Sequence, residues 1–288
     1  MNKPIPVETT SNLVDRVIRL LKSRTSYTVD ESQLSFGFEN SDYHKREHLF
    51  SPNRDVTDFL DFSSSALPDG DVYLFGGILR DIALFGKRGF DSDIDLVVEG
   101  DLNTLVPYLI SQGAKRNKFG GYRFNLGKWP IDIWSARETW AIAEKLVAYE
   151  GISSLLDTTV LNWDAILMNW RTKQVISRLG YFEDIKDRSL DIVLKENPNP
   201  LGMTIRVLRH LCLKDARKIS KRAINYLSDS LKEYSFQEIN KYEIKSYKNP
   251  VIDENIFKFF KLINTDSSKS LSDQFSIVER IMLGQRLH

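Results

Sequence analysis

The chain has 288 residues, 42% of them hydrophobic and 11% aromatic, an ordinary globular composition that excludes disorder over most of its length. Forty Lys and Arg residues against 39 acidic residues leave a net charge of +1, which excludes a global field for a polyanionic partner, so any nucleic-acid surface must be local. The single cysteine, Cys212, excludes a disulfide framework and a disulfide-linked partner.

No stretch approaches the roughly 20 apolar residues that a membrane span needs, and the N-terminal residues lack the apolar core of a signal peptide. We therefore expect a cytoplasmic protein with no membrane partner. The length allows one large domain or two smaller ones, and the sequence shows no internal repeat that would indicate a solenoid.

Residues 1–70 are predicted to form an N-terminal extension with one amphipathic helix. Ser11 or Asn12 can cap this helix at its N-terminus. Its apolar stripe consists of Leu13, Val14, Val17, Ile18, Leu20 and Leu21. The sequence that follows is polar and rich in turn residues, with clusters at 51–53, 63–65 and 68–70.

Residues 71–135 alternate short strand patterns with one helical pattern, as in an α/β unit. The predicted strands cover residues 72–75, 94–99, 122–126 and 131–134. The last two are joined by a hairpin connection at 127–130. Residues 136–234 are predicted to be mostly helical, and the remainder helical and rich in lysine, with turns at 249–250 and 266–268.

The first informative motif is a glycine pair at the end of a predicted strand, in the run Phe75-Gly76-Gly77-Ile78-Leu79-Arg80-Asp81. A strand that passes through two glycines into a helix exposes backbone N–H groups at the positive end of the helix dipole, which favours phosphate binding. Arg80 in the first helical turn adds a planar cation suited to a triphosphate. The structural alternative is a tight turn without a ligand.

The second motif, Asp93-Ile94-Asp95, begins twelve residues after Asp81. Two aspartates at i and i+2 on a strand point to the same face, and this closeness is unfavourable unless a cation lies between them. Oxygen-rich pairs of this kind suit Mg²⁺. A solvated loop is the alternative for the pair alone, but the order and spacing of the two motifs favour a nucleotide site.

Other chemistries fail at specific positions. A calcium loop that starts at Asp91 needs glycine where Leu96 stands and glutamate where Leu102 stands. There is no Walker-type phosphate loop, and His44 and His48 have no glutamate at the metalloprotease position. The segment 151–154 lacks the second glycine of a nucleophile elbow.

The motifs Gly76-Gly77-x-x-Arg80-Asp81 and Asp93-x-Asp95 together resemble the head domain of bacterial tRNA CCA-adding enzymes and poly(A) polymerases, in the polymerase-β-like nucleotidyltransferase superfamily. The similarity continues to about residue 215. It comprises a hairpin with a third carboxylate (131–138), a degraded Phe-Thr-Ile-Asn-Ala segment (161–166), a segment similar to Gly-Gly-x-x-Asp-Leu (180–185) and a neck helix similar to Leu-Arg-Ile-Leu-Arg (205–209).

Two departures from the family pattern indicate a divergent member rather than a housekeeping CCA-adding enzyme. The family's Arg-Arg-Asp triplet is replaced by Leu155-Leu156-Asp157-Thr158, which contains no arginine. The Glu-Asp pair before the neck arginines is replaced by Gly202-Met203, so the aspartate that helps to select the incoming base in the family is missing.

The resemblance implies an α/β head of the polymerase-β-like type, with a small mixed sheet and helices, over residues 71–180. It implies a helical neck and a short basic C-terminal region over 181–288. The implied catalytic residues, which would also hold two Mg²⁺ ions, are Asp93, Asp95 and Asp132. The implied nucleotide-binding residues are Gly76, Gly77, Arg80, Asp81, Arg137, Asp164, Arg206 and Arg209.

Two of these assignments have structural alternatives of similar weight. Asp132 interrupts an apolar strand, where a charge needs a metal or a partner, but a solvated hairpin edge would also accommodate it. Arg137 and Arg206 are equally compatible with surface ion pairs.

A local basic surface is predicted beyond the neck. Residues 206–250 hold eleven Lys or Arg against five Asp or Glu, interleaved with tyrosines that could stack on unpaired bases. Helical spacing places five cations on one face as an RNA-binding stripe: Lys214, Arg217, Lys218, Lys221 and Arg222. A solvated helix face is the alternative.

The sequence thus predicts an Mg²⁺-dependent nucleotidyltransferase that moves a nucleoside monophosphate from an NTP to an RNA 3′ end, with a tRNA-like acceptor, and releases pyrophosphate. The alternative is transfer to a protein or small molecule, or synthesis of a signalling oligonucleotide, in a toxin or defence role. The intact pair Asp93 and Asp95 disfavours a binding module with a dead active site.

Overall fold

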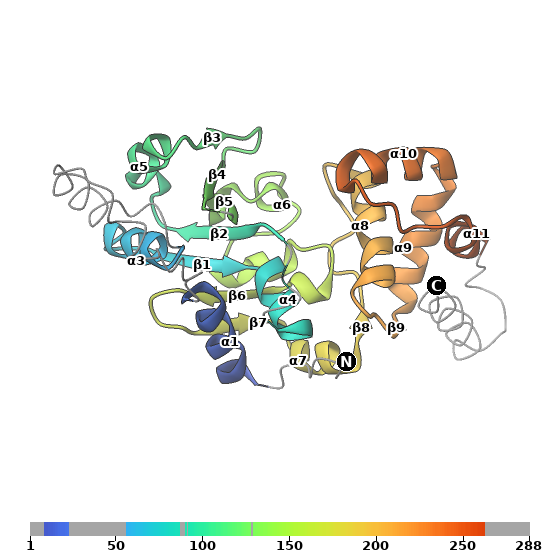
Figure 1. Cartoon of the computed structure of the whole chain (residues 1–288), viewed down its shortest axis with the longest axis horizontal. Helices are drawn as coiled ribbons and strands as arrows, with labels where there is room; N and C mark the ends of the chain where they lie inside the picture. Colours follow the sequence, from blue (N-terminus) through green and yellow to red (C-terminus); the bar gives the residue numbers. More distant parts are fainter. Residues whose placement is uncertain (1–8, 23–55, 87–89, 91, 128, 263–288) are drawn as a thin grey trace, which may run out of the picture.

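In the computed structural model, which describes residues 9–22, 56–86, 90, 92–127 and 129–262, a seven-stranded sheet forms the centre of a head, and a helical part follows it (Figure 1). The strands are β1 (Asp71–Phe75), β2 (Ile94–Glu99), β3 (Lys115–Arg116), β4 (Tyr122–Leu126), β5 (Trp129–Ser135), β6 (Ile166–Asn169) and β7 (Val175–Ser177). Their order in the sheet is β3-β4-β5-β2-β1-β6-β7. Strands β2 and β5 are parallel, and the other neighbouring pairs are antiparallel. The predicted mixed sheet is confirmed.

The four predicted strands are all present. Two of them match residue for residue, as β2 and β4, and the other two extend by one or two residues at their ends. The predicted hairpin between β4 and β5 is also confirmed, but its connection is shorter than expected. Leu126 pairs with Trp129, so Trp129 and Pro130 belong to the strand rather than to the loop.

The prediction of mostly helical structure from residue 136 onward is wrong for the first part of that region. Short 3₁₀ turns occupy much of it, and β6 and β7 complete the sheet. Strand β6 has only four residues, and all four are buried. A strand buried on both faces shows no alternation of polar and apolar residues, so its sequence cannot be distinguished from that of a buried helix.

One face of the sheet is covered by helices that precede, follow or lie beside its strands (Figure 1). They are α1 (Thr10–Lys22), α3 (Val56–Ala66), α4 (Gly77–Phe85) and α5 (Val106–Ser111). Leu13 and Val17 of α1 and Phe59 of α3 are fully buried in the same core as Leu74 of β1. The described parts of residues 1–70 are therefore packed into the head.

Two local predictions in this region are wrong. Helix α1 begins at Thr10, so neither Ser11 nor Asn12 caps it; instead Thr9 Oγ1 accepts a hydrogen bond from the Asn12 N–H (3.3 Å). The serine cluster 63–65 lies in the last turn of α3 and not in a loop. Val56, Phe59, Leu60 and Ser63 form the buried stripe of this helix at i, i+3, i+4 and i+7, a period that overrides the turn preference of serine. The other clusters, at 51–53 and 266–268, lie outside the described residues.

The opposite face of the sheet is only partly covered. The 3₁₀ segment η5 (Ile152–Asp157) packs its Leu155 against Tyr73, Val97 and Leu167, which point from β1, β2 and β6. Further along this face, Asp95 and Asp132 stay partly exposed. The uncovered part of the face is where the candidate site lies.

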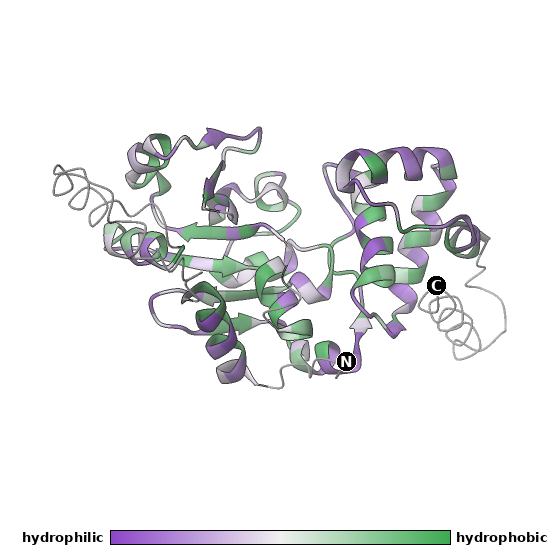
Figure 2. Ribbon diagram, in the orientation of Figure 1, coloured by the Kyte–Doolittle hydropathy of each residue, from purple (hydrophilic) through white to green (hydrophobic). Residues whose placement is uncertain are grey.

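The helical part that follows confirms the predicted neck and body. It consists of α7 (Tyr181–Asp187), α8 (Pro200–Leu213), α9 (Lys221–Lys232), α10 (Phe236–Tyr247) and α11 (Glu254–Leu262), with a two-stranded pairing of β8 (Ser189–Leu190) and β9 (Lys218–Ile219). Its helices show apolar residues on their inner sides and polar residues outside (Figure 2). Capping side chains fix three helix starts, at Asn199, Ser220 and Ser235. Within the described ranges, no helix is long and apolar enough to span a bilayer.

The predicted basic stripe is not a helical face. Helix α8 ends at Leu213 and α9 begins at Lys221, because Ser220 caps a new helix between the predicted stripe positions. Four of the five cations are ion-paired: Lys214 with Asp81 (3.0 Å), Arg217 with Asp215 (3.3 Å), Lys218 with Asp187 (2.6 Å) and Arg222 with Asp191 (2.7 Å). The prediction that these five cations share one helical face is therefore wrong, whereas their binding of RNA stays a prediction.

One of these pairs joins the head to the helical part. Lys214 Nζ, just after α8, donates to the carboxylate of Asp81 in α4, which is fully buried. Arg80 Nε donates to the other oxygen of Asp81 (2.9 Å). Arg188, after α7, donates to the carbonyl of Leu84 in the same helix (3.0 Å). Helix α4 is thus the element on which the helical part is anchored.

We expect Lys214→Gln to lower the free energy of unfolding by about 2 kcal/mol, because the buried Asp81 carboxylate then keeps only Arg80 as a partner. Lys218→Gln is the matched control from the same predicted stripe. It removes a pair in which both side chains are more than half exposed, so no measurable loss is expected. Urea denaturation of the two variants measures the difference, and equal losses would contradict the anchoring role of Lys214.

Candidate active site

Three predicted carboxylates lie together at the uncovered face of the sheet. Asp95 on β2 and Asp132 on β5 are register partners in the parallel ladder, so their side chains share one face. Asp93 directly precedes β2, two residues from Asp95. On the other side of β2, Phe75 at the end of β1 is the register partner of Asp95. The glycine turn that follows Phe75 therefore lies one strand away from the carboxylates.

The pKa values of Asp95 and Asp132 are both raised. Burial raises the pKa of Asp95 to about 7, and the neighbouring charges of Asp132, Asp93 and Asp164 push it in the same direction, while Arg206 opposes them. Burial also raises the pKa of Asp132, against the charge of Arg123. Such a concentration of negative charge favours binding of a cation.

A cation of the protein itself lies between two of the carboxylates. Arg123 on β4 donates through Nη2 to Asp93 Oδ2 (2.5 Å) and through Nη1 to Asp132 Oδ2 (3.2 Å). Arg123 and Asp132 are directly opposite each other in the antiparallel ladder. Sequence analysis missed Arg123. Its signal is the register of the predicted β4–β5 hairpin, which places Arg123 directly opposite Asp132.

The donor set suits a hard cation, because it consists of carboxylate oxygens on one face. As the side chains lie, however, no group of three Asp, Glu, His or Cys residues in the described ranges is arranged to hold a metal ion. The guanidinium of Arg123 takes up one oxygen of Asp93 and one of Asp132. The carboxylates are therefore chemically suited to Mg²⁺. In this structure, however, the guanidinium of Arg123 lies between Asp93 and Asp132.

The glycine turn combines a left-handed residue with a tightly packed one. Gly76 has φ +57°, a conformation that glycine adopts without strain, and its N–H donates to the carbonyl of Ile166 (3.0 Å). A Cβ on Gly77 would lie 3.1 Å from the hydroxyl oxygen of Ser92. Since Gly76 uses its N–H within the sheet, the N–H groups available to a phosphate are those of the first turn of α4.

Arg80 does not present its guanidinium to a ligand, which contradicts the predicted triphosphate fork. The residue is 4% exposed and is paired with Asp81 and Asp164. Burial opposes its charge, but the two carboxylates outweigh that effect, so the pKa of Arg80 lies above its usual value. Asp81 is also buried, and its carboxylate forms ion pairs with Arg80 and Lys214. Both residues hold α4 in place rather than facing a nucleotide.

Asp164, in the 3₁₀ turn η6 (Asn162–Asp164), lies directly behind the glycine turn. A Cβ on Gly76 would lie 3.4 Å from the Asp164 carbonyl oxygen. Burial alone would raise the pKa of Asp164, but the charges of Arg80 and Arg206 outweigh it, so this pKa is lowered. Asp164 is therefore a carboxylate neutralised by Arg80 beside the site.

Helix α8 contributes Arg206 and His210 to the same neighbourhood. The side chain of Arg206 is exposed, and its charge acts on both Asp95 and Asp164. One turn later, His210 Nδ1 donates to the carbonyl of Arg206 (2.7 Å), and its buried Nε2 has no hydrogen-bond partner within the described part of the chain. Burial, with a smaller contribution from Arg80, lowers the pKa of His210 to about 3, so the ring is neutral. Sequence reasoning had set His210 aside.

The other two predicted arginines make contacts elsewhere. Arg137 lies beyond the end of β5, where its guanidinium stacks on the ring of Tyr149 (4.5 Å). Arg209 donates to the buried carboxylate of Glu243 (2.5 Å) and to the carbonyl of Asn249 (2.7 Å). These contacts hold Arg209 against α10 and not over the carboxylates.

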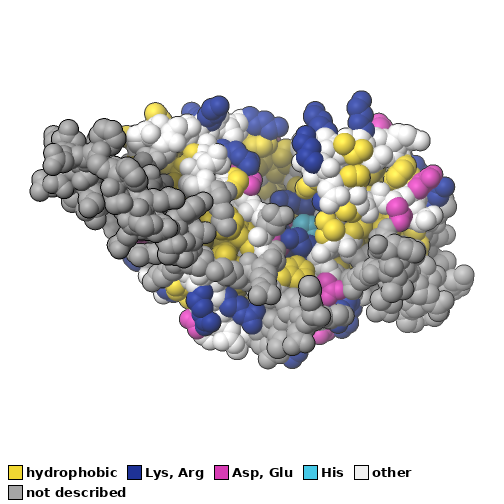
Figure 3. All heavy atoms as spheres, viewed as in Figure 1, with side chains coloured by type: hydrophobic (Ala, Val, Ile, Leu, Met, Phe, Trp, Pro, Cys, Tyr) yellow, Lys and Arg dark blue, Asp and Glu magenta, His cyan; other side chains and the backbone are white. Residues whose placement is uncertain are grey.

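The surface between the two parts of the molecule is hollowed. Figure 3 shows Lys and Arg side chains on both sides of this hollow, on the head and on the helical part.

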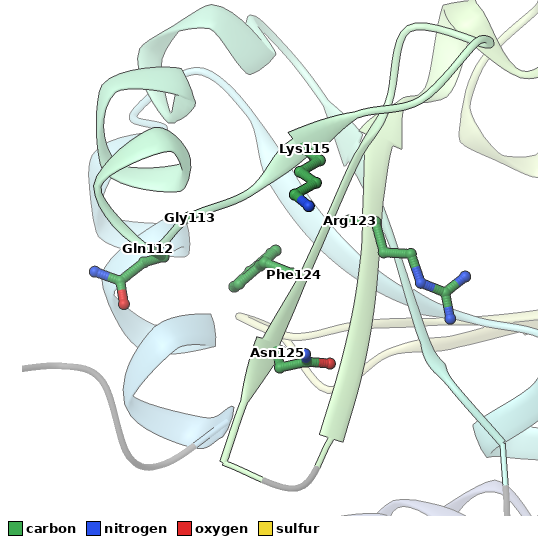
Figure 4. Close-up of a pocket in the computed structure, with 6 residues that line it drawn as sticks. All are labelled: Gln112, Gly113, Lys115, Arg123, Phe124 and Asn125. Carbon is green, nitrogen blue, oxygen red and sulfur yellow. The ribbon is translucent and has the colours of Figure 1, made fainter.

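A separate pocket of about 350 Å³ lies at the edge of the sheet, lined by Gln112, Gly113, Lys115, Arg123, Phe124 and Asn125 (Figure 4). Arg123 thus connects this pocket to the carboxylates.

No protein-family model and no curated protein matches the sequence. Solved structures do match. A Thermotoga maritima CCA-adding enzyme in complex with tRNA shares 19% identity and a TM-score of 0.51, over 85% of this chain and 58% of that chain. A tRNA nucleotidyltransferase with a primer tRNA and an ATP analogue shares 21% identity over 76% of this chain and 58% of its own, with a TM-score of 0.45.

The likeness to the Thermotoga maritima enzyme shows that the two chains share a fold. The predicted architecture, a small mixed sheet with helices followed by a helical part, is thereby confirmed. This chain spans little more than half the length of the structures that it matches.

The neutral His210 generates a pH-dependent contribution to stability. Its pKa is near 3 in the folded chain and near 6.5 when unfolded, so between these values the unfolded state binds more protons. Stability is therefore lost as pH falls below about 6.5, by about 2 kcal/mol between pH 7 and pH 5.

Urea denaturation at pH 7 and pH 5 measures this loss. We expect His210→Gln to lose less stability than the wild type over the same interval, because glutamine does not titrate. Equal losses in both proteins would contradict a neutral, buried His210.

Proposed function

We propose that the protein is a nucleotidyltransferase that transfers a nucleoside monophosphate from an NTP to an RNA 3′ hydroxyl and releases pyrophosphate. The observation that carries the proposal is the adjacency of a glycine turn entering α4 and two register-paired carboxylates, Asp95 and Asp132, on the neighbouring strands. The fold shared with the Thermotoga maritima CCA-adding enzyme, whose structure contains tRNA, supports the same function.

Asp93, Asp95 and Asp132 would hold the Mg²⁺ ions, which supply a lowered pKa for the attacking hydroxyl and neutralise charge on the phosphates. Strands β2 and β5 fix the positions of the carboxylates that would hold these ions. No covalent intermediate on the protein is needed, because positioning and electrostatic stabilisation account for phosphoryl-group chemistry of this type.

The nucleotide would bind at the start of α4. The N–H groups of the first turn point toward a ligand at the positive end of the helix dipole. Arg206, exposed and without an ion pair among the described residues, is the cation of the helical part that we expect to contact the nucleotide, since its charge acts on Asp95. Because Arg80 is neutralised by Asp81 and Asp164, it acts by holding the helix and not by direct contact.

One observation favours the second candidate function, transfer to a protein or a small molecule. The cations predicted to follow an RNA backbone are instead paired with acids of the same chain, with the exception of Lys221, for which the described contacts show no acidic partner. A small acceptor needs no extended basic surface. The acceptor is therefore the part of the proposal that an experiment must decide.

The deciding experiment incubates the protein with each labelled NTP in turn, Mg²⁺ and total cellular RNA and protein. Label in RNA that is removed by a 3′ exonuclease supports the proposal. Label in protein or in small products instead supports the second function. Absence of transfer with all four nucleotides would contradict both.

We expect Asp95→Asn to reduce transfer by at least about a thousandfold, a loss typical of removing a group that stabilises charge in the transition state. The fold should persist, because the substitution removes a charge that burial and three neighbouring carboxylates disfavour. Asp229→Asn on the exposed side of α9 is the matched control and should retain full activity. Near-normal transfer by Asp95→Asn at saturating Mg²⁺ and NTP would exclude a catalytic role.

We expect Gly77→Val to weaken NTP binding at least tenfold, because a branched side chain at the start of α4 occupies the approach of the phosphates. Gly77→Ala separates this effect from packing, since the one tight contact of its Cβ is with Ser92 Oγ at 3.1 Å and its other neighbours lie at ordinary van der Waals distance. Calorimetric titration of NTP measures both variants. Unchanged affinity in a folded Gly77→Val protein would mean that the glycines only form a turn.

A further inference from the structure

The guanidinium of Arg123 occupies the place between Asp93 and Asp132. Its two terminal nitrogens donate to one oxygen of each carboxylate, at 2.5 Å and 3.2 Å. The position is set by the sheet, because Arg123 and Asp132 are opposite residues of the β4–β5 hairpin. Cross-strand pairs of opposite charge stabilise such a hairpin. The contact is therefore built into the register of the two strands.

The guanidinium and a divalent cation cannot hold the same oxygens together. Magnesium binds carboxylate oxygens at about 2.0–2.1 Å, so two oxygens on one ion lie close to a common centre. In this structure, the space between those oxygens contains the nitrogens of Arg123. A cation that bridges Asp93 and Asp132 through these oxygens therefore competes with the arginine.

The arginine can be displaced without repacking the core. Its side chain is 54% exposed and that of Asp93 is 38% exposed, so water screens the pair. Arg123 also lines the pocket at the edge of the sheet, next to Lys115, its register partner on β3. Figure 4 shows the Arg123 side chain extending away from Gln112, across the hairpin. The pocket provides room for another rotamer.

The other nearby arginine acts on a different set of carboxylates. Arg206 from α8 influences Asp95 and Asp164, whereas Arg123 is hydrogen-bonded to Asp93 and Asp132. Only Arg123 is hydrogen-bonded to Asp93 and Asp132, although its charge, like that of Arg206, also acts on Asp95. Displacement of Arg123 frees the pair Asp93 and Asp132 while Arg206 stays on the helical part.

We propose that Arg123 is the counterion of Asp93 and Asp132 when no divalent cation is bound, and that the cation binds by competing with its guanidinium. The inference rests on the proposed function, because it takes these aspartates to be the residues that hold the metal. Arg123 then lowers the affinity for the cation, and stabilises the head in its absence.

The test titrates the metal-free full-length protein with Mn²⁺, followed by electron paramagnetic resonance of the free ion. Arg123→Gln is expected to bind Mn²⁺ about tenfold more tightly than the wild type, as the loss of two screened ion pairs allows. Arg123→Lys, which keeps the charge but cannot donate to both carboxylates from one plane, is expected to lie between them. Arg116→Gln, an exposed arginine of β3, controls for the loss of one positive charge and should match the wild type.

Thermal unfolding in EDTA gives a second readout that does not depend on activity. Arg123→Gln should have a lower Tm than the wild type in EDTA, because the carboxylates lose their counterion. Added Mn²⁺ should raise its Tm by more than it raises that of the wild type, since binding to the folded state stabilises it in proportion to affinity.

The outcomes separate this inference from the proposed function. Equal Mn²⁺ affinity in the wild type and Arg123→Gln would overturn the counterion role and leave the metal-holding role of the aspartates intact. Equal tightening in Arg116→Gln would also overturn it, because a general charge effect would then explain the gain. Absence of Mn²⁺ binding in all four proteins would overturn both the inference and the metal-dependent part of the proposed function.

Discussion

The crowding of carboxylates on one side of the head is the constraint on which the rest of the structure depends. Asp93, Asp95 and Asp132 lie on adjoining strands, and Asp81 and Asp164 lie behind the glycine turn. Each would destabilise the fold if its charge were uncompensated, because burial in a low dielectric makes an unpaired carboxylate costly. The fold therefore supplies cations from several elements: Arg80 from α4, Arg123 from β4, and Lys214 and Arg206 from the helical part.

This distribution of cations explains why the head and the helical part form one unit. Lys214 completes the partners of Asp81, and Arg206 faces Asp95 from the same helix. Residues expected to serve a ligand are thereby used for assembly: Arg80 and Lys214 neutralise buried acids instead of contacting phosphate or RNA. The unfavourable free energy of the clustered carboxylates is offset largely by arginines and lysines that the sequence pattern had assigned to substrate binding.

The strongest patterns were those that could be predicted. Strands β2 and β4 were located to the residue, and the spacing of Gly76, Gly77, Asp93 and Asp95 indicated the candidate site because each motif depends on local geometry. Strand β6 could not be predicted, since burial on both faces removes its period. The predicted helical stripe from Lys214 to Arg222 was wrong for a related reason. It assumed one continuous helix through residue 220, where Ser220 caps the start of a new helix. Contacts such as Arg123 with Asp93 depend on strand pairing and are not visible in sequence spacing.

The same packing logic applies to Gly202 and Met203, which stand where the resemblance in the sequence would place Glu-Asp. A Cβ on Gly202 would lie 2.3 Å from Asn199 Nδ2 and 2.7 Å from the Tyr242 hydroxyl oxygen, so a side chain there requires the capping asparagine and the tyrosine of α10 to shift.

Met203 is packed against the core, where an aspartate would be buried without a partner. Helix α8 therefore offers the site polar groups one and two turns further on, Arg206 and His210. A neutral histidine accepts a hydrogen bond at Nε2 when Nδ1 donates, as it does to the Arg206 carbonyl. The polar groups that this helix places near the acidic cluster are accordingly a cation and a buried neutral acceptor.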